Sequence, residues 1–324
     1  MKAIACKRYG PPEVLEFIEL PKPTPADDEI LIRVRATTVS SGDCRVRSLS
    51  LPRGFGPLGR LALGLRGPRQ AILGTELAGD VESVGRTVTS FKPGDAVFAF
   101  PGGRMGAYVE YKCMAGAGAV ARKPPRLSYE QAAALSFGGS TMLDFYRRAA
   151  LRSGERVLIN GASGAVGTAA IQLAKNAGAN VTAVCSGAKL ELVRAIGADE
   201  AIDYTRDDFT RSGKRFDVIV DLAGTAPFSR SSACLSQGGR LLLVLADLSS
   251  VLLAPWHSLT SGKRVVAGPA AERVAYLHQL AELAEAGRLL PVIDRVVPFE
   301  EMVAAHRYVD QGHKSGNVVV TVGA

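Results

Sequence analysis

The first third of the chain shows the short alternating pattern of β-strands. Residues 29–36 alternate apolar and polar side chains, which is typical of a strand with one buried face. We expect further strands at residues 3–6, 77–85 and 95–100, because each is an apolar run bounded by proline or glycine turns such as 92–95. The pattern therefore predicts a β-rich N-terminal domain.

From residue 127 onward, apolar runs of strand length alternate with stretches of helical periodicity. This alternation is typical of βαβ units around a parallel sheet. Ser128 is a suitable first residue for a helix, and residues 271–287 place Val274, Leu277 and Leu280 on one helical face. We expect helices at 129–136, 141–151, 165–175, 190–196, 271–287 and 299–310, and strands at 157–160, 180–186, 201–204, 216–222, 240–245, 292–297 and 317–321.

Residues 49–72 do not follow either pattern. Leucines alternate there with arginines, and the glycines are too frequent for a long regular helix. One interpretation is a loop or short helix that closes over a pocket and supplies an apolar wall. The other is a surface excursion that packs on its own small core. The sequence does not choose between them.

A glycine-rich turn after the strand at 157–160 is the strongest local motif. Gly161, Gly164 and Gly167 follow that strand and lead into a helix. Strand, glycine turn and helix together are the context of a dinucleotide fingerprint, in which glycine admits a pyrophosphate and the helix N-terminus attracts it. The spacing is GxxGxxG rather than GxGxxG, so a tight turn without a ligand is the alternative.

The composition is that of an ordinary globular protein. The chain has 324 residues, of which 47% are hydrophobic and 22% charged, enough for two domains. No apolar run reaches about 18 residues, so we expect no membrane span. The first residues contain no apolar core of a secretion signal, and five scattered cysteines form no disulfide framework. We therefore expect a cytoplasmic protein.

The net charge of +8 favours anionic partners. A phosphate-rich cofactor is one such partner. Nucleic acid is another, but no lysine- and arginine-rich block with interleaved aromatic residues is present, so we expect no nucleic-acid partner. The simplest interpretation of the charge is a solvated basic surface.

Several segments resemble the medium-chain dehydrogenase/reductase superfamily, specifically its zinc-free, quinone-oxidoreductase-like branch. Besides the glycine turn they are VSSGD (39–43), LGTELAG (73–79), KPGDAV (92–97), GAYVEY (106–111), GAD (197–199) with IDY (202–204), and GHKSGNV (312–318). The resemblance implies an α/β fold with a GroES-like β-rich domain at 1–125, completed by 290–324. A Rossmann domain with a doubly wound parallel sheet would occupy 126–289, and the active site would lie between the two.

The residues at the family's metal positions indicate that zinc is not used. Zinc-dependent members carry a cysteine and a histidine where this chain has Ser40 and Thr75, and neither hydroxyl is a competent zinc ligand. The structural zinc site needs four cysteines, whereas residues 98–114 hold only Cys113. Without a Lewis acid, hydride addition to an electrophilic quinone or α,β-unsaturated carbonyl is easier than oxidation of a simple alcohol.

The strand after the glycine helix indicates NADPH rather than NADH. NAD-binding strands usually end in an acidic residue that binds the ribose 2′-hydroxyl, and residues 180–189 contain none. Ser186 can donate a hydrogen bond to a 2′-phosphate and Lys189 can neutralise it, although Lys189 alone could simply flank a surface helix. The resemblance adds Tyr204 as a second phosphate contact.

The remaining cofactor contacts come from the resemblance. Thr141 matches a hydroxyl contact near the nicotinamide ribose, and Leu245 would line the nicotinamide. Relatives often carry Gly-Lys before the last strand, where this chain has Gly-Asn317, so Lys314 could substitute for the missing charge. The pyrophosphate contacts would be the turn residues Gly161, Ser163, Gly164, Ala165, Val166 and Gly167.

Catalytic side chains are harder to name, because hydride transfer is the chemistry of the cofactor. Ser40 and Ser41 could donate hydrogen bonds to a substrate carbonyl. Asp43 is the most family-like polar residue, acting either in catalysis or in holding its loop and the guanidinium of Arg45 or Arg47. Cys44 could be a reactive thiol or simply a buried one.

The segment at 251–268 forms, in relatives, a strand pair across a two-fold axis. We therefore expect a homodimer, with Trp256 at its interface. The main hypothesis is an NADPH-dependent, zinc-independent reductase of quinones or enones. The alternatives are a biosynthetic enoyl reductase, whose acyl chain would lie against residues 49–72, and an NADPH-binding sensor or RNA-binding protein with little turnover.

Overall fold

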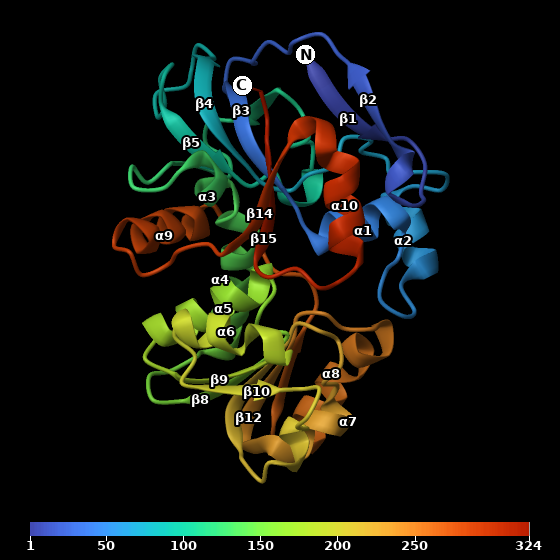
Figure 1. Ribbon diagram of the computed structural model, residues 1–324, viewed down its shortest axis with the longest axis vertical. Helices are drawn as coiled ribbons and strands as arrows, with labels where there is room; N and C mark the ends of the chain where they lie inside the picture. The colour runs from blue at the N-terminus through green and yellow to red at the C-terminus, as the bar shows by residue number, and fades with distance from the viewer. Residues whose placement is uncertain (324) are drawn as a thin grey trace. The chain divides into compact units, whose positions relative to one another are not determined.

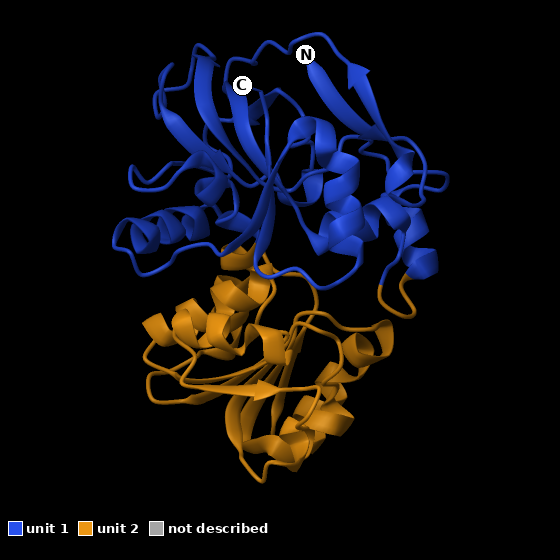
Figure 2. Cartoon of the chain, viewed as in Figure 1, with its two compact units in different colours: residues 1–51, 56–137, 272–324 blue, residues 52–55, 138–271 orange. Residues whose placement is uncertain are grey.

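The computed structural model describes residues 1–323, which divide into two compact units (Figures 1 and 2). Unit 1 comprises residues 1–51, 56–137 and 272–324, and unit 2 comprises 52–55 and 138–271. The predicted division placed 126–137 and 272–289 with the second domain. They belong to unit 1, because the helices in those two stretches pack against its strands.

Unit 1 is built around a seven-stranded sheet with the order β14-β15-β3-β4-β5-β7, in which β6 also pairs with β3. Its strands are β1 (Lys2–Cys6), β2 (Leu15–Glu19), β3 (Glu29–Val39), β4 (Leu77–Val84), β5 (Ala96–Ala99), β6 (Tyr111–Ala115), β7 (Val120–Arg122), β14 (Ile293–Pro298) and β15 (Asn317–Thr321). Its helices are α1 (Ser41–Ser48), α2 (Gly56–Leu63), α3 (Tyr129–Ala133), α9 (Val274–Glu285) and α10 (Met302–Asp310). Strands β1 and β2 form a separate antiparallel pair.

The strands of unit 1 form because alternate residues can be buried on one face. In β3, Ile30, Ile32 and Val34 are almost fully buried, while the exposed Arg33 lies on the other face. The first and last parts of the chain meet in this sheet, since β15 pairs antiparallel with β3. One hydrophobic core therefore joins residues from both ends of the chain.

Unit 2 contains a six-stranded parallel sheet with the order β10-β9-β8-β11-β12-β13. The strands are β8 (Arg156–Asn160), β9 (Asn180–Cys185), β10 (Glu200–Asp203), β11 (Phe216–Asp221), β12 (Leu235–Leu243) and β13 (Arg264–Ala267). The helices are α5 (Ala165–Asn176), α6 (Leu190–Ala195), α7 (Phe228–Ser231) and α8 (Leu248–Thr260), and α4 (Ser136–Ala149) enters from unit 1.

The strand order reverses between β8 and β11, so helices on the two sides of this point cover opposite faces of the sheet. Figure 1 shows α5 and α6 on one face and α7 and α8 on the other. The central strand of the sheet is apolar because both faces are covered: Val157, Leu158 and Ile159 of β8 are each fully buried.

One predicted segment is mostly helical. Residues 251–268 were expected to supply a strand that pairs across a two-fold axis, but α8 occupies Leu248–Thr260 and only Arg264–Ala267 forms a strand. Asp247 begins the helix by accepting a hydrogen bond from the backbone N–H of Ser250 at 2.7 Å. The single strand β13 forms one edge of the sheet.

Candidate functional site

The reversal of strand order in unit 2 is organised by a pair of polar side chains at the strand ends. Asn160 ends β8 and Asp221 ends β11, and the Asn160 amide donates a hydrogen bond to Asp221 Oδ1 at 2.9 Å. The Asp221 carboxylate also accepts the backbone N–H groups of Gly224 (3.0 Å) and Ala226 (2.8 Å). These bonds fix the loop at the carboxyl ends of the strands, where open parallel sheets bind ligands.

The glycine turn lies directly beside this loop. Gly161 has φ +86°, a backbone conformation that favours glycine. A Cβ on Gly167 would lie 2.4 Å from the carbonyl oxygen of Gly161, so the third glycine allows the helix to approach the turn. Gly164 begins α5 without a side-chain cap, and the first N–H groups of a helix have no acceptor within it. Ser163, Ala165 and Val166 complete the turn and the start of α5, and helix N-termini of this kind are suited to bind phosphate groups.

The residues predicted to bind a 2′-phosphate lie at the ends of two adjacent strands. The backbone N–H of Tyr204, just after β10, donates to the carbonyl of Cys185, the last residue of β9. Ser186 follows Cys185, so Ser186 and Tyr204 both lie at the carboxyl ends of the strands. Lys189 ends the short turn that Ser186 begins, and the Tyr204 side chain is 60% exposed.

Asp203 lies next to these residues and was not among the predicted ones. Its Oδ1 accepts hydrogen bonds from the Thr205 N–H (3.0 Å) and hydroxyl (2.8 Å). Those bonds, with another from the Gly187 backbone, lower the pKa of Asp203. The carboxylate thus fastens the two strand ends together. Asp203 lies near Ser186 and Lys189 only because β10 pairs with β9, which places Asp203 beside Cys185. No local motif indicates that pairing.

Helix α4 and the end of β12 supply two further predicted contacts in unit 2. A Cβ on Gly138 would lie 2.8 Å from the carbonyl oxygen of Ala165, so α4 runs close against the start of α5. Thr141 lies almost one turn further along α4. The Leu245 side chain lies against Gly224, in the loop that Asp221 organises. Both residues are therefore carried by elements that border the glycine turn.

In unit 1, Ser40 and Asp43 form the reciprocal cap of helix α1. The Asp43 backbone N–H donates to Ser40 Oγ (3.1 Å), and the Ser40 hydroxyl donates to Asp43 Oδ2 (2.6 Å). Asp43 also accepts the Gly74 N–H at 3.2 Å, and its complete burial raises its pKa. Asp43 therefore holds its loop. It does not hold Arg47, which was one expected partner and pairs instead with Asp310 at 2.5 Å.

This cap bears on the predicted catalytic role of Ser40. A hydroxyl has one hydrogen, and that of Ser40 is donated to Asp43. Ser40 could donate to a substrate carbonyl only if that bond broke. Ser41, the first residue of α1, is exposed. The prediction for both serines stays open, with Ser41 the less constrained of the two.

Glu76 is a buried acid that the sequence analysis did not single out. It is 1% exposed, its Oε1 accepts the Thr38 hydroxyl at 2.6 Å, and its Oε2 accepts the Phe137 backbone N–H at 2.7 Å. Burial raises the pKa of Glu76 to about 7, while the nearby Lys314 ammonium acts in the opposite direction. A charged residue at the start of an apolar strand was the signal that could have identified it.

The two predicted contacts near the C-terminus are both buried in unit 1. Lys314 is 8% exposed, and its ammonium donates to the carbonyl of Gly316. The Asn317 side chain donates to the carbonyl of Val292 at 3.0 Å, where it helps to join β14 and β15. Asn317 thus has a structural partner, whereas Lys314 lies within the electrostatic reach of Glu76.

The donor set at the family's catalytic metal position does not fit zinc. Ser40 and Thr75 present hydroxyls, and the Asp43 carboxylate is already occupied by backbone and hydroxyl donors. Thr75 Oγ1 is buried and has no hydrogen-bond partner among the described residues. Within residues 1–323, no group of three His, Cys, Asp or Glu side chains is arranged to hold a metal ion.

Cys44, considered above as a reactive thiol, is enclosed in the core of unit 1. Its sulfur lies 3.4 Å from Nδ1 of His306, whose Nε2 lies 3.1 Å from the hydroxyl of Tyr108. Burial raises the pKa of the Cys44 thiol and lowers the pKa of His306 to about 3. All three groups are therefore neutral near pH 7. Cys44 is a packed thiol rather than a thiolate nucleophile.

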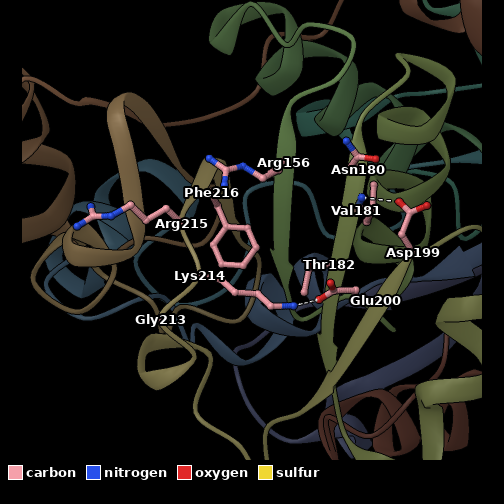
Figure 3. A pocket seen from close by; sticks show the side chains of 10 residues that line it. All are labelled: Arg156, Asn180, Val181, Thr182, Asp199, Glu200, Gly213, Lys214, Arg215 and Phe216. Atoms are coloured by element: carbon pink, nitrogen blue, oxygen red, sulfur yellow. Dashed lines mark hydrogen bonds and ion pairs between the residues drawn. The ribbon is translucent and has the colours of Figure 1, made fainter.

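A hollow of about 670 Å³ lies at the opposite, amino-terminal edge of the unit 2 sheet (Figure 3). Its charged lining is largely paired within the protein. Lys214 contacts Glu200 at 2.5 Å, and Asp199 accepts the backbone N–H of Val181 at 2.7 Å. The hollow therefore offers a ligand fewer polar groups without a partner than the glycine turn does.

Comparison with known proteins agrees with this geometry. Residues 26–128 match the family model described as the alcohol dehydrogenase GroES-like domain, and residues 196–320 match that of a zinc-binding dehydrogenase. The mitochondrial NAD(P)H oxidoreductase RTN4IP1 of Mus musculus is 34% identical over 99% of this chain and 89% of its own. The 2-methylene-furan-3-one reductase of Solanum lycopersicum is 31% identical over 99% and 79%.

A solved quinone oxidoreductase from Coxiella burnetii superposes with a TM-score of 0.88 at 29% identity, covering 100% of this chain and 99% of its own. The fold and these matches define an oxidoreductase with a GroES-like and a Rossmann domain, as the sequence predicted. The chain belongs to the medium-chain dehydrogenase/reductase superfamily, within its quinone-oxidoreductase-like branch. Membership of this superfamily implies a nicotinamide cofactor.

Proposed function

We propose that this chain is a zinc-independent, NADPH-dependent oxidoreductase that transfers hydride to a quinone or an α,β-unsaturated carbonyl. The glycine turn carries the proposal. It lies where the strand order of the sheet reverses, it has uncapped helix N–H groups, and its close backbone approaches need glycine at Gly161 and Gly167. When bound there, the nicotinamide would supply the hydride.

The choice of NADPH rests on the strand ends beyond the turn. Ser186 and Tyr204 offer hydroxyl donors on one edge of the sheet, and Lys189 offers a positive charge in the same turn as Ser186. The one carboxylate among them, Asp203, already accepts several donors and fastens the loop. A 2′-phosphate therefore finds donors and a cation here, whereas a ribose diol would lack the free carboxylate that usually binds it.

The zinc-independent part of the proposal rests on the hydroxyl donor set at Ser40 and Thr75. Because no Lewis acid polarises the acceptor, the acceptor itself must be electrophilic. Quinones and enones meet that condition. The role of this chain is then to bind and orient the cofactor, with Ser41, or Ser40 after release from Asp43, donating to the acceptor oxygen.

The test is the consumption of NADPH and NADH, measured side by side, with a benzoquinone, a naphthoquinone, a short enone and an enoyl thioester. Turnover that prefers NADPH and a quinone or short enone is expected. A strong preference for the thioester would favour the biosynthetic enoyl reductase alternative. NADPH binding without turnover on any acceptor would contradict the proposal and favour a sensor role.

We also propose a homodimer formed through the region of α8 and β13. Strand β13 is an edge strand, and α8, which packs against it, exposes Leu252, Trp256 and Leu259 by 68%, 64% and 84%. Sedimentation should give the mass of a dimer, and Trp256→Glu should give a monomer. A wild-type monomer at all concentrations would contradict this part. The cytoplasmic location remains a prediction, and the mouse relative is named as mitochondrial.

A further inference from the structure

The stretch between Asp43 and Glu76 has an unusual charge distribution. Residues 44–75, which we call the basic segment, contain no aspartate or glutamate and six arginines. Arg47 is buried and paired with Asp310, but four others are exposed on the surface. These four are Arg53, Arg60, Arg66 and Arg69. The segment therefore exposes positive charge to solvent, and no acidic residue within residues 44–75 offsets it.

Within the basic segment, helix α2 and the turn after it expose leucines. Leu58, Leu61 and Leu65 are 53%, 66% and 70% exposed. Leu58 and Leu61 are three residues apart on one helical face, and Leu65 follows four residues later. Isolated exposed leucines are ordinary, but three within eight residues form a patch. These three leucines therefore lie outside any core, whereas Leu49 and Leu51 of the same segment lie against Gly59 of α2.

The side of the segment that faces the protein is made of small residues. Gly59 is buried, and a Cβ there would lie 1.9 Å from Cδ1 of Leu51. Gly64 is also buried, and its carbonyl accepts the hydroxyl of Tyr9 at 2.8 Å. Glycines thus let α2 pack closely against Leu51 of its own segment and against Tyr9, while Leu58, Leu61 and Leu65 point outward. This arrangement reverses the usual pattern of a surface helix, in which the leucines face the core.

The arginines are held beside the exposed leucines. Arg60 Nη1 donates to the carbonyl of Leu65 at 3.1 Å, and Arg69 Nη2 donates to the carbonyl of Leu61 at 2.9 Å. These bonds satisfy carbonyl groups near the end of α2 and fix both guanidinium groups within the leucine patch. Apolar side chains and cations therefore share one surface.

We propose that α2 and the following turn, residues 56–66, dock this protein on an anionic phospholipid surface. The leucines would enter the boundary between headgroups and acyl chains, and the arginines would bind lipid phosphates, for which a guanidinium is well shaped. This goes beyond the reaction proposed above and does not depend on it. None of the helices among residues 1–323 has the length and apolarity to cross a bilayer, so the docking is peripheral.

The chemistry of the patch favours lipid over other occupants. Two copies that met through this surface in a symmetric dimer would bring like charges together, because the basic segment has no acids to complement them. A nucleic acid would leave three leucines without a partner. An anionic lipid surface offers phosphates for the arginines and an apolar layer for the leucines at the same depth. Such a peripheral contact is compatible with the absence of an expected membrane span.

The test is flotation of the full chain with vesicles of phosphatidylcholine alone or with one third phosphatidylglycerol. Binding is expected to the anionic vesicles only and to weaken at high salt, because the charges are exposed. The double variant Leu61→Ser/Leu65→Ser should reduce partitioning on the order of tenfold or more. Arg66→Gln, which removes no hydrogen bond found among the described residues, should reduce it about fivefold. The control Leu290→Ser removes an exposed leucine elsewhere in unit 1 and should change nothing.

A second measurement locates the contact. Trp256 is the only tryptophan, so Trp256→Phe combined with Leu61→Trp places a single fluorophore on α2. Its emission should shift to shorter wavelength with anionic vesicles, whereas Leu290→Trp in the same background should not respond. Absence of flotation, or flotation that the leucine variant does not reduce, would overturn the proposal. So would a dimer that the leucine variant dissociates in the absence of any vesicle binding.

Discussion

The carboxylate of Glu76 accepts a hydrogen bond from the backbone N–H of Phe137 at 2.7 Å, so a residue next to the start of β4 stabilises the first turn of α4. The opposite carboxylate oxygen accepts the Thr38 hydroxyl, and the side chain is fully enclosed. Burial raises the pKa of Glu76 to about 7, which makes this contact sensitive to pH.

We predict that Glu76 makes the protein less stable as the pH rises from about 4.5 to 7. In that range the unfolded chain has lost the proton of Glu76, whereas the folded protein retains it. The stabilising contribution of Glu76 is thus complete below the pKa that it has in the unfolded chain. It is lost as the pH rises through the pKa that Glu76 has in the folded protein. A shift from 4.5 to about 7 corresponds to about 3 kcal/mol.

Urea unfolding of the wild type and of Glu76→Gln at pH 5 and pH 8 measures this contribution. The side chain of the glutamine variant does not titrate. Between pH 5 and pH 8 the free energy of unfolding of the wild type should therefore fall relative to that of the variant by about 3 kcal/mol. A difference that is the same at both pH values would show that Glu76 ionises normally.

His306 should have the opposite pH dependence. Its folded-state pKa is lowered to about 3 by burial, so the folded protein holds a neutral ring that the unfolded chain would protonate. Stability from this group is present above pH 6.5 and is lost as the pH falls, by about 1.4 kcal/mol for each pH unit. His306→Asn should flatten the stability curve between pH 6.5 and 4. An unchanged acid slope in the variant would assign acid sensitivity to other groups.

Lys189→Ala should weaken NADPH binding by about 1.5–3 kcal/mol, the scale of a hydrogen bond to a charged group, with little effect on NADH. Titration of both dinucleotides by calorimetry measures the difference. Lys214→Ala is the matched control, because Lys214 lies at the amino-terminal edge of the same sheet and is paired with Glu200. An equal loss for both cofactors would remove Lys189 from the phosphate site.

Two glycine variants separate the ligand role of the turn from its structural role. Gly167→Ala should lower the melting temperature, because its Cβ would lie 2.4 Å from the Gly161 carbonyl oxygen. At Gly164, the nearest atom to an added Cβ is 3.9 Å away, so Gly164→Ala should leave the fold intact. If a pyrophosphate binds there, Gly164→Ala should nevertheless lose at least about tenfold in NADPH affinity by steric contact. Unchanged affinity would favour a tight turn without a ligand.

Metal analysis of the purified protein should find no stoichiometric zinc, and chelator treatment should not reduce NADPH oxidation. The reason is the hydroxyl donor set at Ser40 and Thr75. The inactivation of the enzyme by a chelator, with recovery on adding zinc, would contradict the zinc-independent proposal.

Local patterns in the sequence were sufficient for much of the fold. Strand β15 has the bounds that were expected, and Ser128 caps α3 with Gln131 in a reciprocal hydrogen-bond pair. Helix α4 was expected to begin at Thr141, but it begins at Ser136 and includes Gly138 and Gly139. Gly138 is helical since only glycine lets α4 approach Ala165, so tertiary packing outweighs its low helix propensity.

The parts that were missed depend on contacts between distant residues. Glu76 meets Phe137, and Asn160 meets Asp221, each across 61 positions in the chain. Neither partner carries a local motif that would point to the other. Helix α8 was missed because the resemblance indicated a strand in this segment, and Pro255 within it made a helix less expected. Pairing across the fold is therefore what the structure adds to the candidate site.

The position of β15 between β14 and β3 has a consequence for how the protein is made. During synthesis, the sheet of unit 1 lacks two neighbouring strands until residues 293–321 have left the ribosome. Residues 138–271 are continuous in the chain and can complete their own sheet earlier. In the meantime β3 can pair with β4 and β6, but the side of β3 that later pairs with β15 stays open, and such an exposed strand edge can pair with other chains.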